Sequence, residues 1–175
     1  MQKTIWLAVG AALVLLLGVF YVLRNNQVKS EEDKETQLST ATHRFEKVLA
    51  YENDYMGYAS NTNNLFNNLP LADKKEGIEL NSDESILIVN YKTVSDEEVE
   101  KAVIYNATAA FVLIKNLQEI DMRFSNHSYA VTRENVEHWF GGNFAELIEP
   151  SFFKEAVQDQ LLKPNTNEWL TVYIN

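Results

Sequence analysis

The sequence contains no cysteine, and this absence narrows the kinds of site that it could hold. Disulfides, thiolate metal centres and cysteine nucleophiles are all excluded. Basic residues are also scarce, since 15 Lys and Arg stand against 25 Asp and Glu and the net charge is −10. Nucleic acid is therefore not expected as a partner, because phosphate binding needs a basic surface.

Familiar catalytic and cofactor-binding motifs are missing as well. The sequence has no G-x-S-x-G, phosphate loop or dinucleotide-binding fingerprint. Glu134 and His138 would share one face of a helix, but two ligands do not make a metal site unless the fold adds Asp121 or His127. We therefore expect no metal and no cofactor.

One short match to a catalytic motif exists. Ser151 and Lys154 fit the S-x-x-K pattern of penicillin-recognising enzymes, in which the lysine helps to activate a serine at the start of a helix. The companion S-D-N and K-T-G motifs are absent, so we interpret Ser151 as the beginning of a helix and expect a protein without enzymatic activity. A serine hydrolase or acylated sensor using Ser151 remains an alternative.

A long uncharged run is the clearest feature that the sequence does have. Residues 4–23, TIWLAVGAALVLLLGVFYVL, would form a helix of about 30 Å, the thickness of a hydrocarbon core, with Trp6 and Tyr21 near its two ends. A cleaved signal peptide is the rival interpretation, but no run of small residues precedes Arg24. We predict a single-pass anchor in the cell membrane, with the bilayer as a partner.

The rest of the chain divides around this anchor. Residues 1–3 form a short tail, residues 24–40 a polar linker and residues 41–175 an α+β domain. The positive-inside rule does not decide the orientation, because basic residues flank the run on both sides. The very short amino-terminal tail favours a carboxyl-terminal domain outside the cytoplasm.

Hydrophobic periodicity predicts a domain in which an antiparallel sheet packs on one long helix. The helix begins at a capping box, Ser95 to Glu98, and its apolar positions continue to Leu117. Thr132 should cap a short helix that stops at Gly141. The expected hairpins cover residues 78–80 with 85–91 and 120–125 with 128–131, and a helix over 151–162 and a final strand over 168–175 follow.

The stretch from Tyr51 to Pro70, YENDYMGYASNTNNLFNNLP, holds six asparagines and three tyrosines. Gly57 permits a turn, and Leu65, Phe66 and Leu69 form the apolar face of a short helix capped by Ser60 or Asn61 and stopped by Pro70. Its polar groups could instead bind a ligand or partner. The residues of that candidate surface are Tyr51, Tyr55, Tyr58, Asn61 and Asn64.

The same stretch resembles a known family. Tyr55-Met-Gly57, Asn64-Leu65 and Leu69-Pro-Leu71 are similar to the first motif of the domain-of-unknown-function 4825 family, and the similarity continues through ILIVNY at 86–91 to about Ile148. The resemblance implies a membrane-anchored extracytoplasmic domain of Gram-positive bacteria, with relatives joined to sensor-transducer and anti-sigma-type proteins. It implies no activity, because none is assigned to the family.

Two non-enzymatic functions are alternatives to an enzymatic one. The first is a sensing or protein-interaction module at the outer face of the membrane, with a membrane or envelope protein as its partner. The second is a glycan- or peptidoglycan-binding module, in which Tyr51, Tyr55 and Tyr58 stack on sugars while asparagine amides bond their hydroxyls. The direction of the tyrosine rings should separate exposed binding groups from buried core residues.

Overall fold

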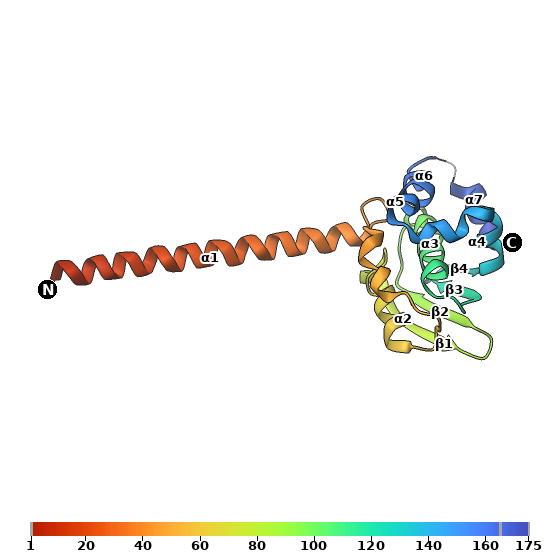
Figure 1. Ribbon diagram of the computed structural model, residues 1–175, viewed down its shortest axis with the longest axis horizontal. Helices are drawn as coiled ribbons and strands as arrows, with labels where there is room; N and C mark the ends of the chain where they lie inside the picture. Colours follow the sequence, from red (N-terminus) through yellow and green to blue (C-terminus); the bar gives the residue numbers. More distant parts are fainter. Residues whose placement is uncertain (1, 165, 175) are drawn as a thin grey trace. The chain divides into compact units, whose positions relative to one another are not determined.

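The computed structural model describes residues 2–164 and 166–174, and the side chains of residues 17–164 and 166–174. The chain divides after Thr36 into two units (Figure 1). The first unit consists of most of α1 (Gln2–Leu38). The second unit holds every other element and is an α+β domain, as the sequence predicts.

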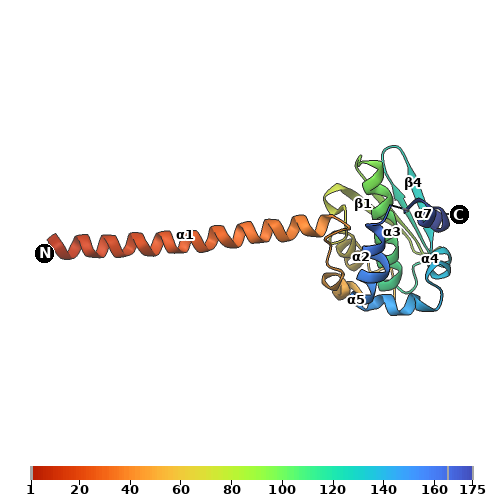
Figure 2. The ribbon, with the colours of Figure 1, turned by 90° about the horizontal axis from the view of Figure 1, so that it is seen from above.

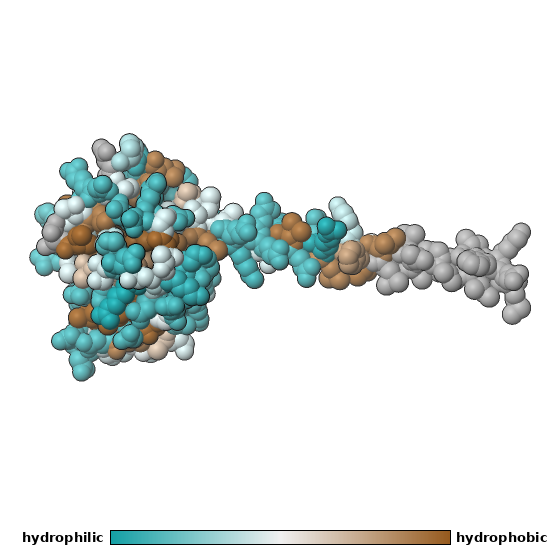
Figure 3. Space-filling model, turned by 180° about the vertical axis from the view of Figure 1, so that it is seen from behind, coloured by the Kyte–Doolittle hydropathy of each residue, from teal (hydrophilic) through white to brown (hydrophobic). Residues whose placement is uncertain are grey.

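The polar linker expected over residues 24–40 is largely helical, which corrects the sequence-based boundary. The α1 helix continues without interruption to Leu38. Residues 24–40 contain neither glycine nor proline, and they are rich in Glu, Gln and Lys, which have high helix propensity. Figure 3 shows that the described part of α1 passes from hydrophobic to mostly hydrophilic residues along its length.

Within the part of the chain that the structure describes, no helix is both long and apolar enough to cross a membrane. Residues 4–16 of the expected anchor lie outside the residues whose side chains are described. The expected anchor therefore stays a prediction.

The domain is built on a four-stranded sheet in which the strands lie in the order in which they follow along the chain (Figure 1). Figure 2 labels the two edge strands, β1 and β4. Pairs β1–β2 and β3–β4 are antiparallel, which confirms the two expected hairpins. The central pair β2–β3 is parallel, so the expectation of a purely antiparallel sheet is wrong. The strands are β1 (Lys75–Asn81), β2 (Ile86–Tyr91), β3 (Glu119–Arg123) and β4 (Ser128–Thr132).

The parallel pair follows from the helix between its strands. Helix α3 (Asp96–Leu113) carries the chain from the end of β2 back to the start of β3, which is the crossover that parallel neighbours require. Its residues from Ala102 to Ala110 are all buried, as expected of a central helix. Inward residues of the sheet, including Leu87, Val89 and Ile120, belong to the same core.

The ends of the helices confirm most of the predicted boundaries. The side chain of Thr132 accepts a hydrogen bond from Asn135 N at 3.3 Å, and α4 (Arg133–Phe140) stops at Gly141, whose φ of 55° suits glycine. At Ser95 the expected capping box is not formed, because its hydroxyl donates to the Glu98 carboxylate at 2.5 Å and accepts no hydrogen bond from a backbone N–H of the helix.

The helix expected over residues 151–162 is present in three joined pieces. They are α5 (Pro150–Phe153), a π-helical turn (Lys154–Gln158) and α6 (Asp159–Leu161). A 3₁₀ segment (Gly141–Ile148) leads into them from α4. Phe153 of α5 is fully buried in the core.

The final strand predicted over residues 168–175 is wrong, because this segment is helix α7 (Thr166–Ile174). Its buried residues, Thr166, Trp169, Leu170 and Tyr173, recur at helical spacing. Leu170, Val172 and Ile174 also recur at every second position, and this alternation is the pattern that predicts a strand. The contacts of α7 with α3, α4 and β4 decide in favour of the helix.

Candidate functional site

The predicted tyrosine and asparagine surface lies between a 3₁₀ turn (Leu49–Tyr51) and helix α2 (Ala59–Phe66). Met56 is fully buried at the centre of this loop, whereas Tyr55 and Tyr58 on either side are 45% and 63% exposed. Tyr51 is only half-buried. We call the exposed side chains of Tyr55 and Tyr58, with the loop that carries them, the tyrosine surface.

The loop is attached to the segment that follows α3. Asn53 N donates to Leu113 O at 2.8 Å, and Lys115 N donates to Asn53 O at 3.1 Å, so the two segments form a short parallel bridge. The Asn116 side chain then accepts a hydrogen bond from Met56 N at 2.6 Å. These bonds and the burial of Met56 fix the backbone beneath the two rings.

The asparagines of this stretch mainly organise the loop. The side-chain amides of Asn53 and Asn61 donate to Tyr51 O at 3.0 and 2.7 Å, and Asn68 Nδ2 donates to the Tyr51 hydroxyl at 3.0 Å. Such bonds from asparagine to nearby backbone are typical of turns and helix ends. Asn61 is thus half-buried and bonded to backbone, and Asn64 is exposed.

The two exposed rings stand almost at right angles. Their centroids are 5.8 Å apart and their planes meet at 85°. Gly57 allows this arrangement, because a Cβ atom at that position would lie 2.2 Å from Tyr55 Cε1. The rings therefore do not form the single flat platform that sugar stacking would use, although both are accessible.

Charged side chains flank the tyrosine surface, and sequence reasoning did not identify them. The Lys115 ammonium lies 2.6 Å from Asp54 Oδ1 and 3.9 Å from Glu52 Oε1. The hydrogen bond to Asp54 raises the pKa of Lys115 above its ordinary value. Lys115 and Asp54 lie far apart in the sequence, and the backbone bridge and the hydrogen bond from Met56 N to Asn116 bring their segments together.

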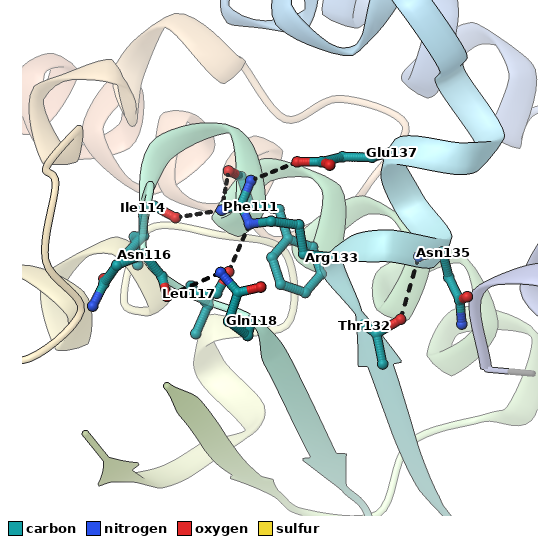
Figure 4. A network of polar contacts seen from close by, with 9 residues as sticks. All are labelled: Phe111, Ile114, Asn116, Leu117, Gln118, Thr132, Arg133, Asn135 and Glu137. Atoms are coloured by element: carbon teal, nitrogen blue, oxygen red, sulfur yellow. Dashed lines mark hydrogen bonds and ion pairs between the residues drawn. The ribbon is translucent and has the colours of Figure 1, made fainter. Parts of the chain in front are cut away.

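A second missed residue, Arg133, holds the other side of the segment after α3 (Figure 4). Its guanidinium donates to the carbonyls of Phe111, Ile114 and Leu117 at 2.7–2.9 Å. The cation thereby satisfies carbonyls at the negative end of the helix. It also lies 5.3 Å from the ring centroid of Phe111. Arg133 and Asn116 together fix the segment that supports the tyrosine surface.

The candidate catalytic and metal-binding residues do not converge. Lys154 Nζ donates to Asp159 Oδ1 at 2.5 Å, whereas Ser151 is exposed in the first turn of α5. Glu134 and His138 are exposed on α4. Among the residues that the structure describes, no group of three His, Asp or Glu could hold a metal ion.

His43 is a buried titratable group outside the tyrosine surface. Its Nε2 donates to Asn68 O at 2.7 Å, so its Nδ1 accepts a hydrogen bond from the Tyr105 hydroxyl, also at 2.7 Å. Burial lowers the pKa of His43 to about 4. The histidine is therefore neutral near pH 7 and stabilises the segment that begins the domain.

Two hollows of the domain are lined by other residues. One of about 150 Å³ lies among Leu38, Pro70, Leu71 and Lys101, and one of about 280 Å³ lies beside Gln158. Neither contains a tyrosine of the candidate surface. The tyrosine surface lies outside both of these hollows, and its two rings are open to solvent.

Comparison with known proteins places this geometry in a family. Residues 48–134 match the family model described as Domain of unknown function (DUF4825). No curated protein and no solved structure matches the chain. The matched region contains the tyrosine surface, the sheet, α3 and Arg133, and it ends before α5 and α7. Through these residues the chain belongs to the domain-of-unknown-function 4825 family.

Proposed function

We propose that this protein is a membrane-anchored, extracytoplasmic sensing or protein-interaction module without a catalytic site. Its partner is a membrane or envelope protein, which it binds through the tyrosine surface. The observation that carries this proposal is the pair of exposed rings, Tyr55 and Tyr58, on a loop fixed by the buried side chain of Met56.

The chemistry of the surface supports a protein partner. Tyrosine supplies a large contact area with few rotatable bonds, and it is enriched among the residues that dominate binding energy at protein interfaces. Hydrogen bonds from Tyr55 N to Asn53 Oδ1 and from Met56 N to Asn116 Oδ1 already order the loop. A partner would therefore bind without a large cost for ordering it.

The uncharged run of residues 4–23 supports the membrane anchor. At its described end the large hydrophobic side chains are all more than half exposed, as a surface covered by lipid would require. They are Leu17, Val19, Phe20, Tyr21, Val22 and Leu23.

Alkaline carbonate extraction of cell membranes tests the anchor. The full chain should stay in the membrane pellet, whereas Leu13→Arg with Leu16→Arg should release it, because each central arginine costs about 3 kcal/mol on insertion scales. Val28→Arg, in the polar part of α1, serves as the control. Release of the unaltered chain would contradict the anchor.

A glycan-binding module is the second candidate, and the exposure of Tyr55 and Tyr58 is the observation that favours it. The perpendicular rings offer a sugar one ring face at a time, which makes this candidate weaker than a protein partner.

Affinity purification of the full chain from crosslinked cells separates the two candidates. Tyr58→Ala should reduce recovery of the protein partner at least tenfold, since a central interface tyrosine contributes about 2 kcal/mol. Leu162→Ala, at another exposed position, should leave recovery unchanged. Equal recovery from both variants would contradict the proposal, and Tyr58-dependent sedimentation with purified peptidoglycan, without a protein partner, would favour glycan binding.

A further inference from the structure

Acidic side chains lie next to the tyrosine surface. Asp54 directly precedes Tyr55, and Glu52 lies two residues earlier. Both carboxylates share the ammonium group of Lys115, at 2.6 and 3.9 Å. These three groups together carry a net negative charge, in a chain whose net charge is −10.

The two rings add a second kind of cation-binding group. Tyr55 and Tyr58 meet at 85°, so the face of one ring stands beside the edge of the other. The face of an aromatic ring carries partial negative charge, and such faces attract ammonium and guanidinium groups. Exposed aromatic rings that follow two carboxylates closely in the sequence suit a cation better than an anion or a purely apolar group.

We propose that the tyrosine surface recognises a cationic side chain, Arg or Lys, of the protein partner. The ring faces of Tyr55 and Tyr58 bind the stem and charged head, and the carboxylates of Asp54 and Glu52 accept its hydrogen bonds. This inference rests on the proposed function, because it names the chemistry of the partner at the same surface.

Lys115 is an internal cation that the partner replaces. Its side chain is 62% exposed and that of Asp54 is 80% exposed. An ion pair so open to water contributes little to stability, so the exchange of one cation for another costs little. The backbone bridge between Asn53 and Ile114 keeps the carboxylates in place when Lys115 leaves them.

Fluorine NMR of the full chain in zwitterionic micelles tests this recognition. Tyrosines are replaced by 3-fluorotyrosine, and the resonances of Tyr55 and Tyr58 are assigned by single substitutions to Phe. The probe is N-acetyl-arginine amide, and its neutral isostere N-acetyl-citrulline amide is titrated at the same ionic strength. The arginine probe should shift both resonances in a saturable way and bind at least about fivefold more tightly than the citrulline probe.

Variants identify the groups responsible. Tyr58→Leu should weaken binding of the arginine probe at least fivefold, and Lys115→Ala should strengthen it by about twofold, because it removes a competing cation whose exposed ion pair is weak. Lys154→Ala removes an exposed lysine that pairs with Asp159 elsewhere, so it should change nothing.

Equal binding of the two probes, or no effect of Tyr58→Leu, would overturn the inference. The proposed function can fail separately. If crosslinking captures a protein through Tyr58 while both probes act alike, cation recognition is wrong and the interaction module stands. If the arginine probe binds but no protein is captured, the cation site stands and the proposed partner is wrong.

Discussion

At Gly57 the backbone passes so close to the Tyr55 ring that a side chain has no room there. An added Cβ atom would lie 2.2 Å from the ring, but the ring is 45% exposed and can turn into solvent. The absence of a side chain at Gly57 therefore affects the arrangement of the two tyrosine rings more than it affects the stability of the domain.

Gly57→Ala should therefore change the stability of the domain by less than about 1 kcal/mol while it separates the two rings. Ring-to-ring nuclear Overhauser effects between Tyr55 and Tyr58 should disappear, and partner recovery should fall. Gly77→Ala, at a glycine with no atom within 4 Å of an added Cβ, is the matched control. Retention of the Overhauser effects in Gly57→Ala would show that the ring arrangement has another cause.

His43 makes the stability of the domain depend on pH. Its pKa is lowered from 6.5 to about 4 by burial, so the unfolded chain takes up the proton first as the pH falls. The neutral histidine contributes fully above pH 6.5, and this contribution is lost progressively between pH 6.5 and 4. The full shift corresponds to about 3 kcal/mol.

Urea unfolding at pH 7.5 and 4.5 measures this effect. The loss of unfolding free energy between the two pH values should be about 2.5 kcal/mol smaller in His43→Leu than in the unaltered protein. His127→Leu alters an exposed histidine and should leave the loss unchanged. An identical pH dependence in all three proteins would contradict the assignment to His43.

At the scale of the element, the carboxyl end of α3 depends on Arg133, the first residue of α4. The Arg133 side chain is only 13% exposed, and it donates to three backbone carbonyls. If a buried carbonyl loses its hydrogen-bond donor, the free energy of removing it from water is no longer compensated, and the folded state is destabilised.

Arg133→Met should accordingly lower the unfolding free energy by about 3 kcal/mol. Arg123→Met is the control, since Arg123 is 47% exposed and pairs with Asp121 on the surface, and it should cost less than about 1 kcal/mol. Urea unfolding of the two variants provides the comparison. Similar small losses in both would show that the carbonyls find other donors.

Helix α7 is tested by proline at two positions. Thr171→Pro removes a backbone N–H inside the helix and brings the ring against the Asn167 carbonyl, which costs about 3 kcal/mol. Asn167→Pro falls in the first turn, where proline is tolerated, and should cost much less. Thermal unfolding of the two variants measures the difference, and equal losses would contradict a helix in this segment.

The elements differ in how far they can be predicted from sequence. Local periodicity and turn residues predict helix α3 and both hairpins. The exposure of Tyr58 is consistent with its local sequence. The parallel β2–β3 pair, the Arg133 hydrogen bonds and the contact of Lys115 with Asp54 join residues far apart in the chain. Such contacts depend on the tertiary fold, and no local pattern in a single sequence specifies them.

Helix α7 shows a second limit, because nine residues fit both a strand and a helix period until their neighbours are known. The tyrosines in the sequence were sufficient to predict most of the candidate site. The charged residues beside it, Lys115, Asp54 and Glu52, could not be predicted in this way.

For the whole molecule, α1 and the domain have separate roles in this account. In the proposed function, the uncharged run would hold the chain at a membrane, and the domain would present one ordered loop to a partner. The net charge of −10 attracts a positively charged partner over long distances. This attraction weakens as the salt concentration rises, because dissolved ions screen the charges.

Photo-crosslinking at Tyr58 in intact cells tests the central claim most directly. The full chain carries p-benzoylphenylalanine at position 58 or, as a control, at the exposed position Leu162. We predict one dominant protein adduct from position 58, absent from position 162 and reduced severalfold by Tyr55→Ala. Equal adducts from both positions, or no adduct at position 58, would contradict the claim that this surface binds the partner.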